Sequence, residues 1–150
     1  DTPELINIFD QEKIVLKNLK KVFLMLAGAG MKKFGMDLEK EQEVLLAISD
    51  VLFELYMAES AILRTEKNCK RFGQDSQIGQ IAMSQLYLYE ANELISNKAK
   101  ELIFSLSEGS EQKFLLMGLK RFTKYYEYPK PIKLKRIISK IVSAENRYCF

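Results

Sequence analysis

Histidine and tryptophan are absent from this sequence, and it contains only three prolines and two cysteines. Without histidine, the chain cannot use Ser-His or Cys-His nucleophile activation, histidine-bound metals, or the Glu-x-x-His pairs of di-iron bundles. Cys69 and Cys149 are typical of a reducing compartment, and we do not expect a disulfide between them, because that bond needs a specific geometry. No run of about 18 uncharged apolar residues occurs, so we expect no transmembrane helix.

What remains is an ordinary globular composition, with 47% hydrophobic and 29% charged residues in a chain of 150. A chain of this length can bury a core without disulfides or metals, and we expect residues 1–150 to form a single domain. The first residues, DTPEL, have neither an initiator Met nor the basic-then-apolar form of a signal peptide. We therefore expect a C-terminal fragment of a longer chain.

Positive charge is concentrated in the last quarter of the chain. Residues 113–150 hold ten Lys or Arg against two Glu, whereas residues 1–112 carry a net negative charge. A basic segment of this kind can meet an anionic lipid surface, a nucleic acid or an acidic partner. A solvated helix face is the commoner meaning of a charge run. No zinc-finger, recognition-helix or ribonucleoprotein signature is present, which disfavours nucleic-acid binding.

The longest unbroken helical pattern is Val44–Lys67, which contains neither Gly nor Pro. Its apolar stripe, spaced by three, four or seven residues, consists of Leu45, Ile48, Leu52, Leu55 and Ile62. Glu59 occupies the one turn of that stripe where an apolar residue is expected. We therefore expect Glu59 to be buried, facing Gln85 or Asn92 and fixing the helix register, as polar seam residues do in coiled coils.

Capping residues and glycines predict where the first two helices begin and end. Asp10 is placed to cap a helix that begins near Gln11, and Gly35 to end it. Within that helix Gly28 and Gly30 are expected to allow close backbone approach to a crossing helix. The second helix is expected to begin after a cap at Asp37 and to run through the central stretch as far as about Arg71, before Gly73.

Three further helices follow by the same reasoning. The third is expected to begin after Asp75 or Ser76, to reach about Leu106 and to stop at Gly109. Ser110 starts a shorter fourth helix, and a Pro-Lys-Pro joint precedes a last helix at about 132–144. One side of that last helix is basic, with Lys133, Lys135, Arg136 and Lys140. The expected fold is all-α, an antiparallel four-helix-bundle-like domain with a short C-terminal helix.

Three pairs of carboxylates lie within helical reach of each other: Asp50 and Glu54, Glu59 and Glu66, and Glu90 and Glu93. Catalysis by a carboxylate needs several convergent groups, and the sequence shows no such set around any of these pairs. We expect them to be structural. The sequence predicts no catalytic, cofactor-binding or metal-binding residue.

Four segments resemble the C-terminal helical region of acyl-CoA dehydrogenases: Lys20–Gly30, Ile48–Lys67, Gln85–Ala91 and Arg136–Phe150. The resemblance is to the branch with an extra domain after the flavin-binding core, which includes the very-long-chain enzymes. The family often ends in Arg-Tyr-Pro-Phe, and Cys149 stands here at the position of that Pro. The family's Tyr-Glu-Gly-Thr-x segment and its flavin-contacting strands are missing, so no catalytic residue is carried over.

The resemblance implies a parent protein that uses FAD to remove hydrogens from Cα and Cβ of an acyl-CoA thioester. For this chain it implies no catalysis and no cofactor, but packing against the parent's catalytic domains or a second subunit of a homo-oligomer. It also implies a cytoplasmic location with membrane-side association. The residues alone leave two alternatives open: a stand-alone helical adaptor or dimerisation module, and a basic-tailed binder of nucleic acid or membranes.

Overall fold

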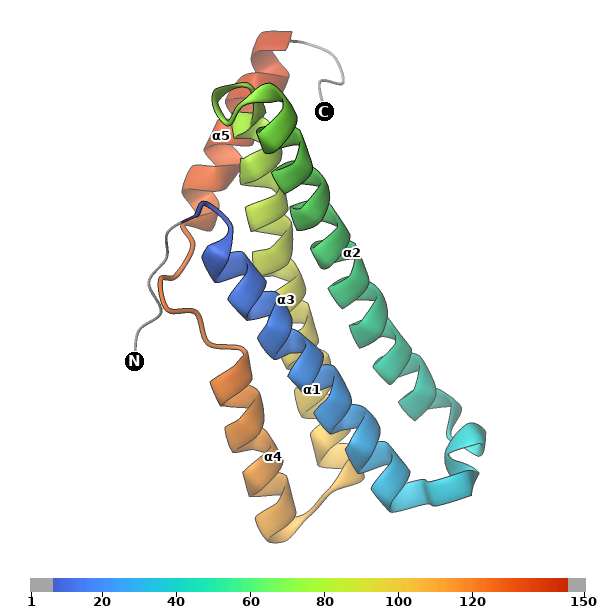
Figure 1. The fold of residues 1–150 in the computed structure, drawn as a ribbon. Coiled ribbons are helices and arrows are strands. Elements are labelled where there is room, and N and C mark those ends of the chain that lie inside the picture. The colour runs from blue at the N-terminus through green and yellow to red at the C-terminus, as the bar shows by residue number, and fades with distance from the viewer. Residues whose placement is uncertain (1–6, 146–150) are drawn as a thin grey trace.

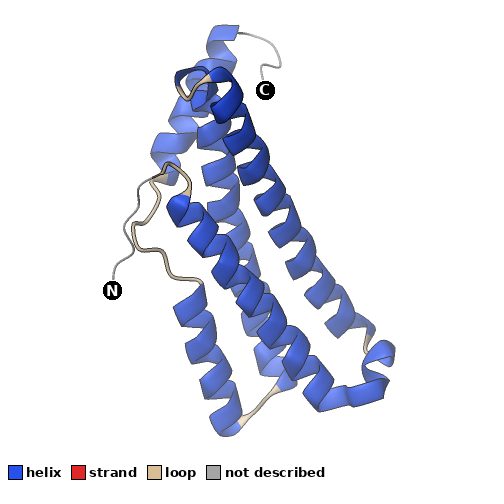
Figure 2. Ribbon diagram, viewed as in Figure 1, coloured by secondary structure: helices blue, strands red, loops and turns tan. Residues whose placement is uncertain are grey.

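A computed structural model describes residues 7–145, which form helices joined by short turns, with no strand among them. The elements are α1 (Asp10–Phe34), η1 (Gly35–Lys40), α2 (Gln42–Phe72), η2 (Asp75–Gln77), α3 (Ile78–Leu106), α4 (Gly109–Phe122) and α5 (Pro131–Glu145). Figure 1 shows the long helices α1, α2 and α3 side by side, with α4 beside one end of α1. Figure 2 shows loops and turns between the helices, the longest of them between α4 and α5. The predicted all-α bundle, with three long helices, a shorter fourth and a short C-terminal helix, is confirmed.

Helix α3 lies at the centre of the bundle, because it packs against α1, α2, α4 and α5. Its inward positions alternate large and small side chains, in the order Leu88, Ala91, Ile95 and Ala99, and all four are buried. Small residues at these positions let neighbouring helices approach closely, while the larger ones fill the space between them. The core is therefore organised around α3 rather than around the longer α2.

The buried stripe of α2 is rotated relative to the predicted one. The buried residues are Ile48, Val51, Leu55, Ala58, Ile62, Thr65 and Cys69. Leu52 is 47% exposed and Leu45 is only half-buried. At 100° per residue, Val51 and Ala58 share one side with Leu55 and Ile62, while positions 52 and 59 fall at its edge. The prediction is confirmed for Ile48, Leu55 and Ile62 and was wrong for Leu45 and Leu52, because α2 carries apolar residues on both sides.

The glycines at helix ends were predicted with mixed success. Gly35 and Gly73 follow α1 and α2 with φ values of +55° and +85°, which L side chains rarely adopt, so both are confirmed as stops. Gly109 has φ +58° but opens α4 instead of ending α3. The prediction for Gly28 and Gly30 was wrong. A Cβ on Gly28 would meet open space, and one on Gly30 would meet side chains at 3.5 Å, an ordinary contact.

The predicted N-terminal caps were wrong, because each side chain makes a different local bond. Asp10 is the first residue of α1, and its carboxylate accepts a hydrogen bond from the backbone N–H of Asn7 at 2.7 Å. Asp37 lies in η1 and pairs with Lys40 at 2.6 Å, so α2 begins later than predicted. The Ser76 hydroxyl donates backward to the end of α2 and makes no cap for α3. Short polar side chains often satisfy nearby backbone groups in such alternative ways.

Candidate functional site

Glu59 is not the buried register-setting residue that the sequence predicts. Its carboxylate forms an ion pair with Lys20 of α1 at 2.6 Å, and a third of its side chain stays exposed. Gln85 and Asn92, its predicted partners, lie elsewhere in the bundle. Gln85 donates to Glu12 at 2.8 Å, and Asn92 donates to a backbone carbonyl after α4 at 3.0 Å. Buried polar contacts between helices therefore exist, but Glu59 is not among them.

The carboxylates of α2 near its middle are held by groups on α3. Asp50 accepts from Lys98 at 2.6 Å, and Glu54 accepts from the Tyr87 hydroxyl at 3.0 Å. Burial, followed by the Glu54 hydrogen bond, raises the pKa of Tyr87, which keeps its hydroxyl protonated. Asp50 and Glu54 thus tie α2 to α3.

In the other predicted carboxylate pairs, Glu59, Glu66 and Glu90 each form ion pairs with lysines instead of acting together. Glu66 accepts from Lys13 at 2.7 Å and from Lys70 at 3.2 Å. The hydrogen bond from Lys13 is the main cause that lowers the pKa of Glu66, partly offset by desolvation. Glu90 pairs with Lys135 of α5 at 3.0 Å. These contacts link helices, and they do not assemble a catalytic acid–base pair.

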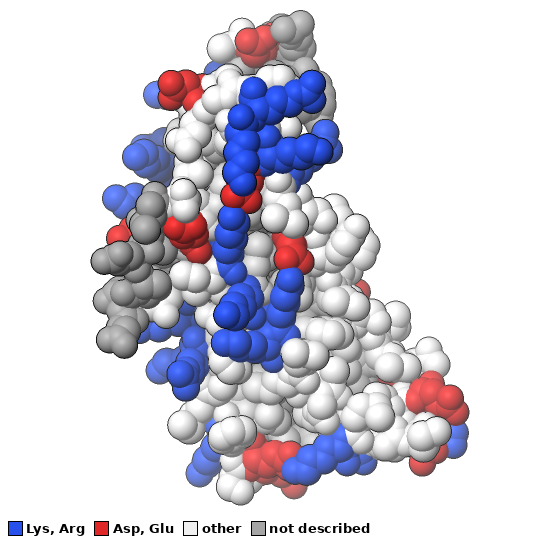
Figure 3. Space-filling model, viewed as in Figure 1, with Lys and Arg blue, Asp and Glu red and all other residues white. Residues whose placement is uncertain are grey.

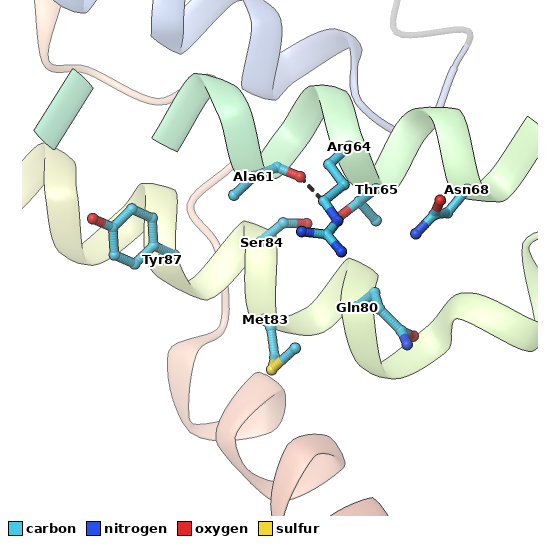
Figure 4. A pocket seen from close by; sticks show the side chains of 8 residues that line it. All are labelled: Ala61, Arg64, Thr65, Asn68, Gln80, Met83, Ser84 and Tyr87. Carbon is cyan, nitrogen blue, oxygen red and sulfur yellow. Dashed lines mark hydrogen bonds between the residues drawn. The ribbon is translucent and has the colours of Figure 1, made fainter. Parts of the chain in front are cut away.

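A recess of about 300 Å³ between α2 and α3 is lined largely by polar side chains. Its lining residues, shown in Figure 4, are Ala61, Arg64, Thr65, Asn68, Gln80, Met83, Ser84 and Tyr87. Arg64 is the one charged residue in this lining. The hydroxyls of Thr65 and Ser84 donate to carbonyls of their own helices, so neither is paired with a base that would activate it. The recess has the chemistry of a polar groove rather than an active site.

Cys69, at the end of α2, is a buried free thiol. Burial is the largest of the effects that raise the pKa of Cys69, so the thiolate needed for nucleophilic attack is disfavoured. Cys149 lies outside the described residues, and the prediction of no disulfide between the two stays a prediction.

The side of α2 that points away from the bundle carries large exposed apolar side chains. We call this set the outer α2 face: Leu46, Leu52, Phe53, Tyr56, Met57 and Leu63. Phe53 is 62% exposed and Tyr56 65% exposed. An apolar groove of about 320 Å³ between α1 and α2 continues the face toward Leu24, which is also exposed. Contiguous exposed apolar surface of this kind marks an interaction site in a well-folded domain.

Basic side chains border the outer α2 face. Figure 3 shows a column of Lys and Arg along the surface formed by α1 and α2, beside a broad area without charge over the middle of α2. Lys20 of the groove belongs to this border, and its ion pair with Glu59 leaves half of its side chain exposed. An apolar centre with a charged rim is the usual composition of a protein–protein interface.

The described residues offer no fit to a metal or a flavin. No group of three or more His, Cys, Asp or Glu residues between positions 7 and 145 can hold a metal ion. A recess of about 600 Å³ in the same range is an open groove, and the one cation in its lining, Lys32, forms an ion pair with Glu111 at 2.8 Å. Nothing there resembles a cradle for a dinucleotide pyrophosphate. Within residues 7–145, no helix has the length and hydropathy to cross a membrane.

Comparison with known proteins shows to which family this domain belongs. A family model for the C-terminal domain of acyl-CoA dehydrogenases matches residues 18–121. A probable acyl-CoA dehydrogenase of Bacillus subtilis is 32% identical over 117 residues, which is 78% of this chain and 20% of that protein. The crystal structure of an acyl-CoA dehydrogenase complexed with FAD from Bacillus anthracis matches with a TM-score of 0.92 and 32% identity. That match covers 96% of this chain and 25% of the other.

The chain therefore belongs to the family of acyl-CoA dehydrogenase C-terminal domains. It spans only a fifth to a quarter of the length of the relatives described above. The resemblance stated from the sequence is confirmed. The outer α2 face was not predicted, although the excess of apolar residues around Val44–Lys67 was a signal for it.

Proposed function

We propose that this chain is the non-catalytic C-terminal domain of a longer, FAD-dependent acyl-CoA dehydrogenase. In that protein it packs, through the outer α2 face, against the catalytic domains or a second subunit of a homo-oligomer. The parent's reaction is the α,β-dehydrogenation of an acyl-CoA thioester in the cytoplasm, and FAD binds in the parent's catalytic part. The single observation that carries the packing role is the outer α2 face, because six large apolar side chains lie exposed on one helix.

The arrangement of the outer α2 face supports a specific interface. Phe53 and Tyr56 are three residues apart, so they lie on the same side of the helix. Large aromatic side chains at the centre of an interface contribute most of the binding energy when a partner excludes water from them. The residues one turn before Phe53 and one turn after Tyr56, Ser49 and Ser60, are exposed and small. The chain matches only 20% and 25% of the two relatives. The remaining part of such a protein is large enough to be the partner of this face.

Membrane-side association through α5 is a second candidate function. None of the residues of α5 is fully buried, and Lys133, Arg136 and Lys140 are exposed on it. A basic amphipathic helix of this kind can rest on an anionic lipid surface. The outer α2 face favours packing as the main role, since its apolar area exceeds what α5 exposes.

The substitution Phe53→Glu tests the packing role. When the chain and the remainder of the full-length protein are produced separately, we expect them to bind each other. Phe53→Glu should weaken this binding at least about tenfold, because the carboxylate would lose water on entering an apolar contact. Isothermal titration calorimetry measures the affinity.

Phe114→Glu is the matched control, since Phe114 is 72% exposed on α4, away from α2. It should leave the affinity unchanged, and circular dichroism should show both variants folded. Equal affinities for the wild type and Phe53→Glu would contradict the proposed function.

A further inference from the structure

The first turn of α1 holds the connector between α4 and α5, residues 123–130. The Gln11 amide donates to the carbonyl of Glu127 at 2.8 Å and accepts from the N–H of Glu127 at 2.7 Å. At the start of the connector, Asn92 of α3 donates to the carbonyl of Thr123 at 3.0 Å. Figure 1 shows the connector passing beside the start of α1. Side chains from two helices thus hold the start and the middle of this segment.

A cluster of buried polar groups lies under the connector. Glu12 is 8% exposed, Asn92 is 2% exposed and Tyr125 is 4% exposed. Among the described residues, Glu12 Oε2, Asn92 Oδ1 and the Tyr125 hydroxyl have no hydrogen-bond partner. Glu12 Oε1 accepts from Gln85 at 2.8 Å, so only half of this carboxylate is satisfied. A buried carboxylate with an unpaired oxygen costs less free energy when it is protonated than when it is charged.

The titratable groups that act on this cluster disfavour a further negative charge. Burial is the main cause that raises the pKa of Glu12, and Asp10 of the same turn adds to it, while hydrogen bonds from the backbone of Glu12 and from Gln85 oppose it. Burial and the nearby Glu12, Glu93 and Tyr89 hold the pKa of Tyr125 far above its usual range. Tyr125 therefore stays a neutral phenol, and Glu12 is the group whose charge changes.

Helix α5 packs against α3, and the connector is the segment that leads the chain into it. Among the helices of the described part of the chain, it packs against α3 alone, and none of its residues is fully buried. One ion pair, between Lys135 and Glu90 at 3.0 Å, adds a surface contact of small energy. A helix of 15 residues is marginal by itself in water. Tyr125, the buried side chain of the connector, is the anchor that precedes it.

We propose that Glu12 and the connector form a proton-dependent latch that sets how firmly α5 is held against α3. With Glu12 protonated, the cluster holds no charge and the connector stays clamped over it. When Glu12 loses its proton, the buried charge lies near the carboxylate of Asp10 and the neutral phenol of Tyr125, and the connector loosens. The latch consists of contacts inside the domain. A test of the latch is therefore independent of whether the outer α2 face binds a partner.

The direction of the pH effect follows from the raised pKa of Glu12. A folded-state pKa above the ordinary value of 4.5 means that the clamped form binds the proton more tightly than the open form. The stabilisation is complete below pH 4.5 and declines as the pH rises through the raised pKa. Acidification therefore tightens the latch, and alkaline conditions loosen it.

Hydrogen exchange of the full-length protein, followed by mass spectrometry on peptides that cover residues 131–145, tests this proposal. Between about pH 5 and pH 8, the protection of α5, corrected for intrinsic exchange, should fall at least about threefold. Glu12→Gln keeps the hydrogen-bonding shape without a titrating proton, so its α5 protection should not change with pH. Glu59→Gln, which changes a partly exposed carboxylate, should keep the dependence of the wild type.

Gln11→Ala provides a second variant that does not alter Glu12. It removes both bonds to Glu127, so α5 protection should be lower at every pH while peptides from α2 keep theirs. Protection of α5 that does not vary with pH in the wild type would overturn the latch. So would a pH dependence that persists in Glu12→Gln.

Discussion

Replacing Ile95 with alanine is expected to lower the free energy of unfolding of the chain by about 2–5 kcal/mol. Ile95 is fully buried in α3, the helix that contacts every other main helix of the described bundle. Removing its outer carbons loses their burial and leaves a cavity that α1 and α2 cannot close without moving. Urea unfolding followed by circular dichroism measures the change.

Leu94→Ala is the control for this effect, because Leu94 directly precedes Ile95 in α3 and is 37% exposed. Its loss should change the free energy of unfolding by only about 0.5 kcal/mol. Similar values for the two variants would show that α3 is not the centre of the core.

Asn92→Ala is expected to lower the free energy of unfolding by about 1–3 kcal/mol. The Asn92 amide is buried and donates to the carbonyl of Thr123, which needs a partner at the end of α4. Without the amide, the carbonyl of Thr123 loses its hydrogen bond, and a cavity is left where the Asn92 side chain was buried. The midpoint of urea unfolding should fall accordingly.

Asn97→Ala is the matched control for the same amide chemistry, since Asn97 is exposed on α3. It should leave the free energy of unfolding within about 0.5 kcal/mol of the wild type. If Asn92→Ala were equally mild, the contact between α3 and the connector would contribute little to stability.

The helices of this domain could be predicted from the sequence because their apolar residues recur with a helical period over 14 to 31 residues. The first residues of the helices could not be predicted, because side chains such as Asp37 and Ser76 can bond to several nearby groups. Asp37 pairs with Lys40, and Ser76 donates to the carbonyl of Phe72. That choice depends on how η1 and η2 turn the chain. Glycines predicted the ends of α1 and α2 more reliably than polar residues predicted the helix starts. Gly35 and Gly73 both adopt a positive φ, a conformation in which glycine is favoured.

The exact buried side of α2 could not be predicted, because its sequence carries apolar residues on two sides. Leu52 and Leu63 fall in register with a plausible core stripe, yet both lie on the outside. A helix with two apolar sides gives the same pattern whether its second neighbour lies within the domain or in a partner protein. Only the positions of α1 and α3 decide which side is covered, and those positions are set by long-range contacts.

The cluster around Glu12 could not be predicted for a similar reason. Glu12 stands in an acidic first turn, where an exposed carboxylate is the ordinary expectation. Its burial follows from the connector, and the contact between Gln11 and Glu127 spans 116 positions of the chain. Local sequence carries no information about such a contact. The family resemblance, in contrast, was carried by short segments and needed no knowledge of packing.

Hydroxyl-radical footprinting tests most directly whether the outer α2 face is covered in the parent protein. The full-length protein and the chain of residues 1–150 are labelled side by side, and the modification of Phe53 and Tyr56 is compared with that of Phe114 on α4. All three side chains are more than half exposed in this domain. We expect Phe53 and Tyr56 to react several-fold more slowly in the full-length protein, with Phe114 unchanged. Equal rates at Phe53 and Tyr56 in the two proteins would contradict a packing role for α2.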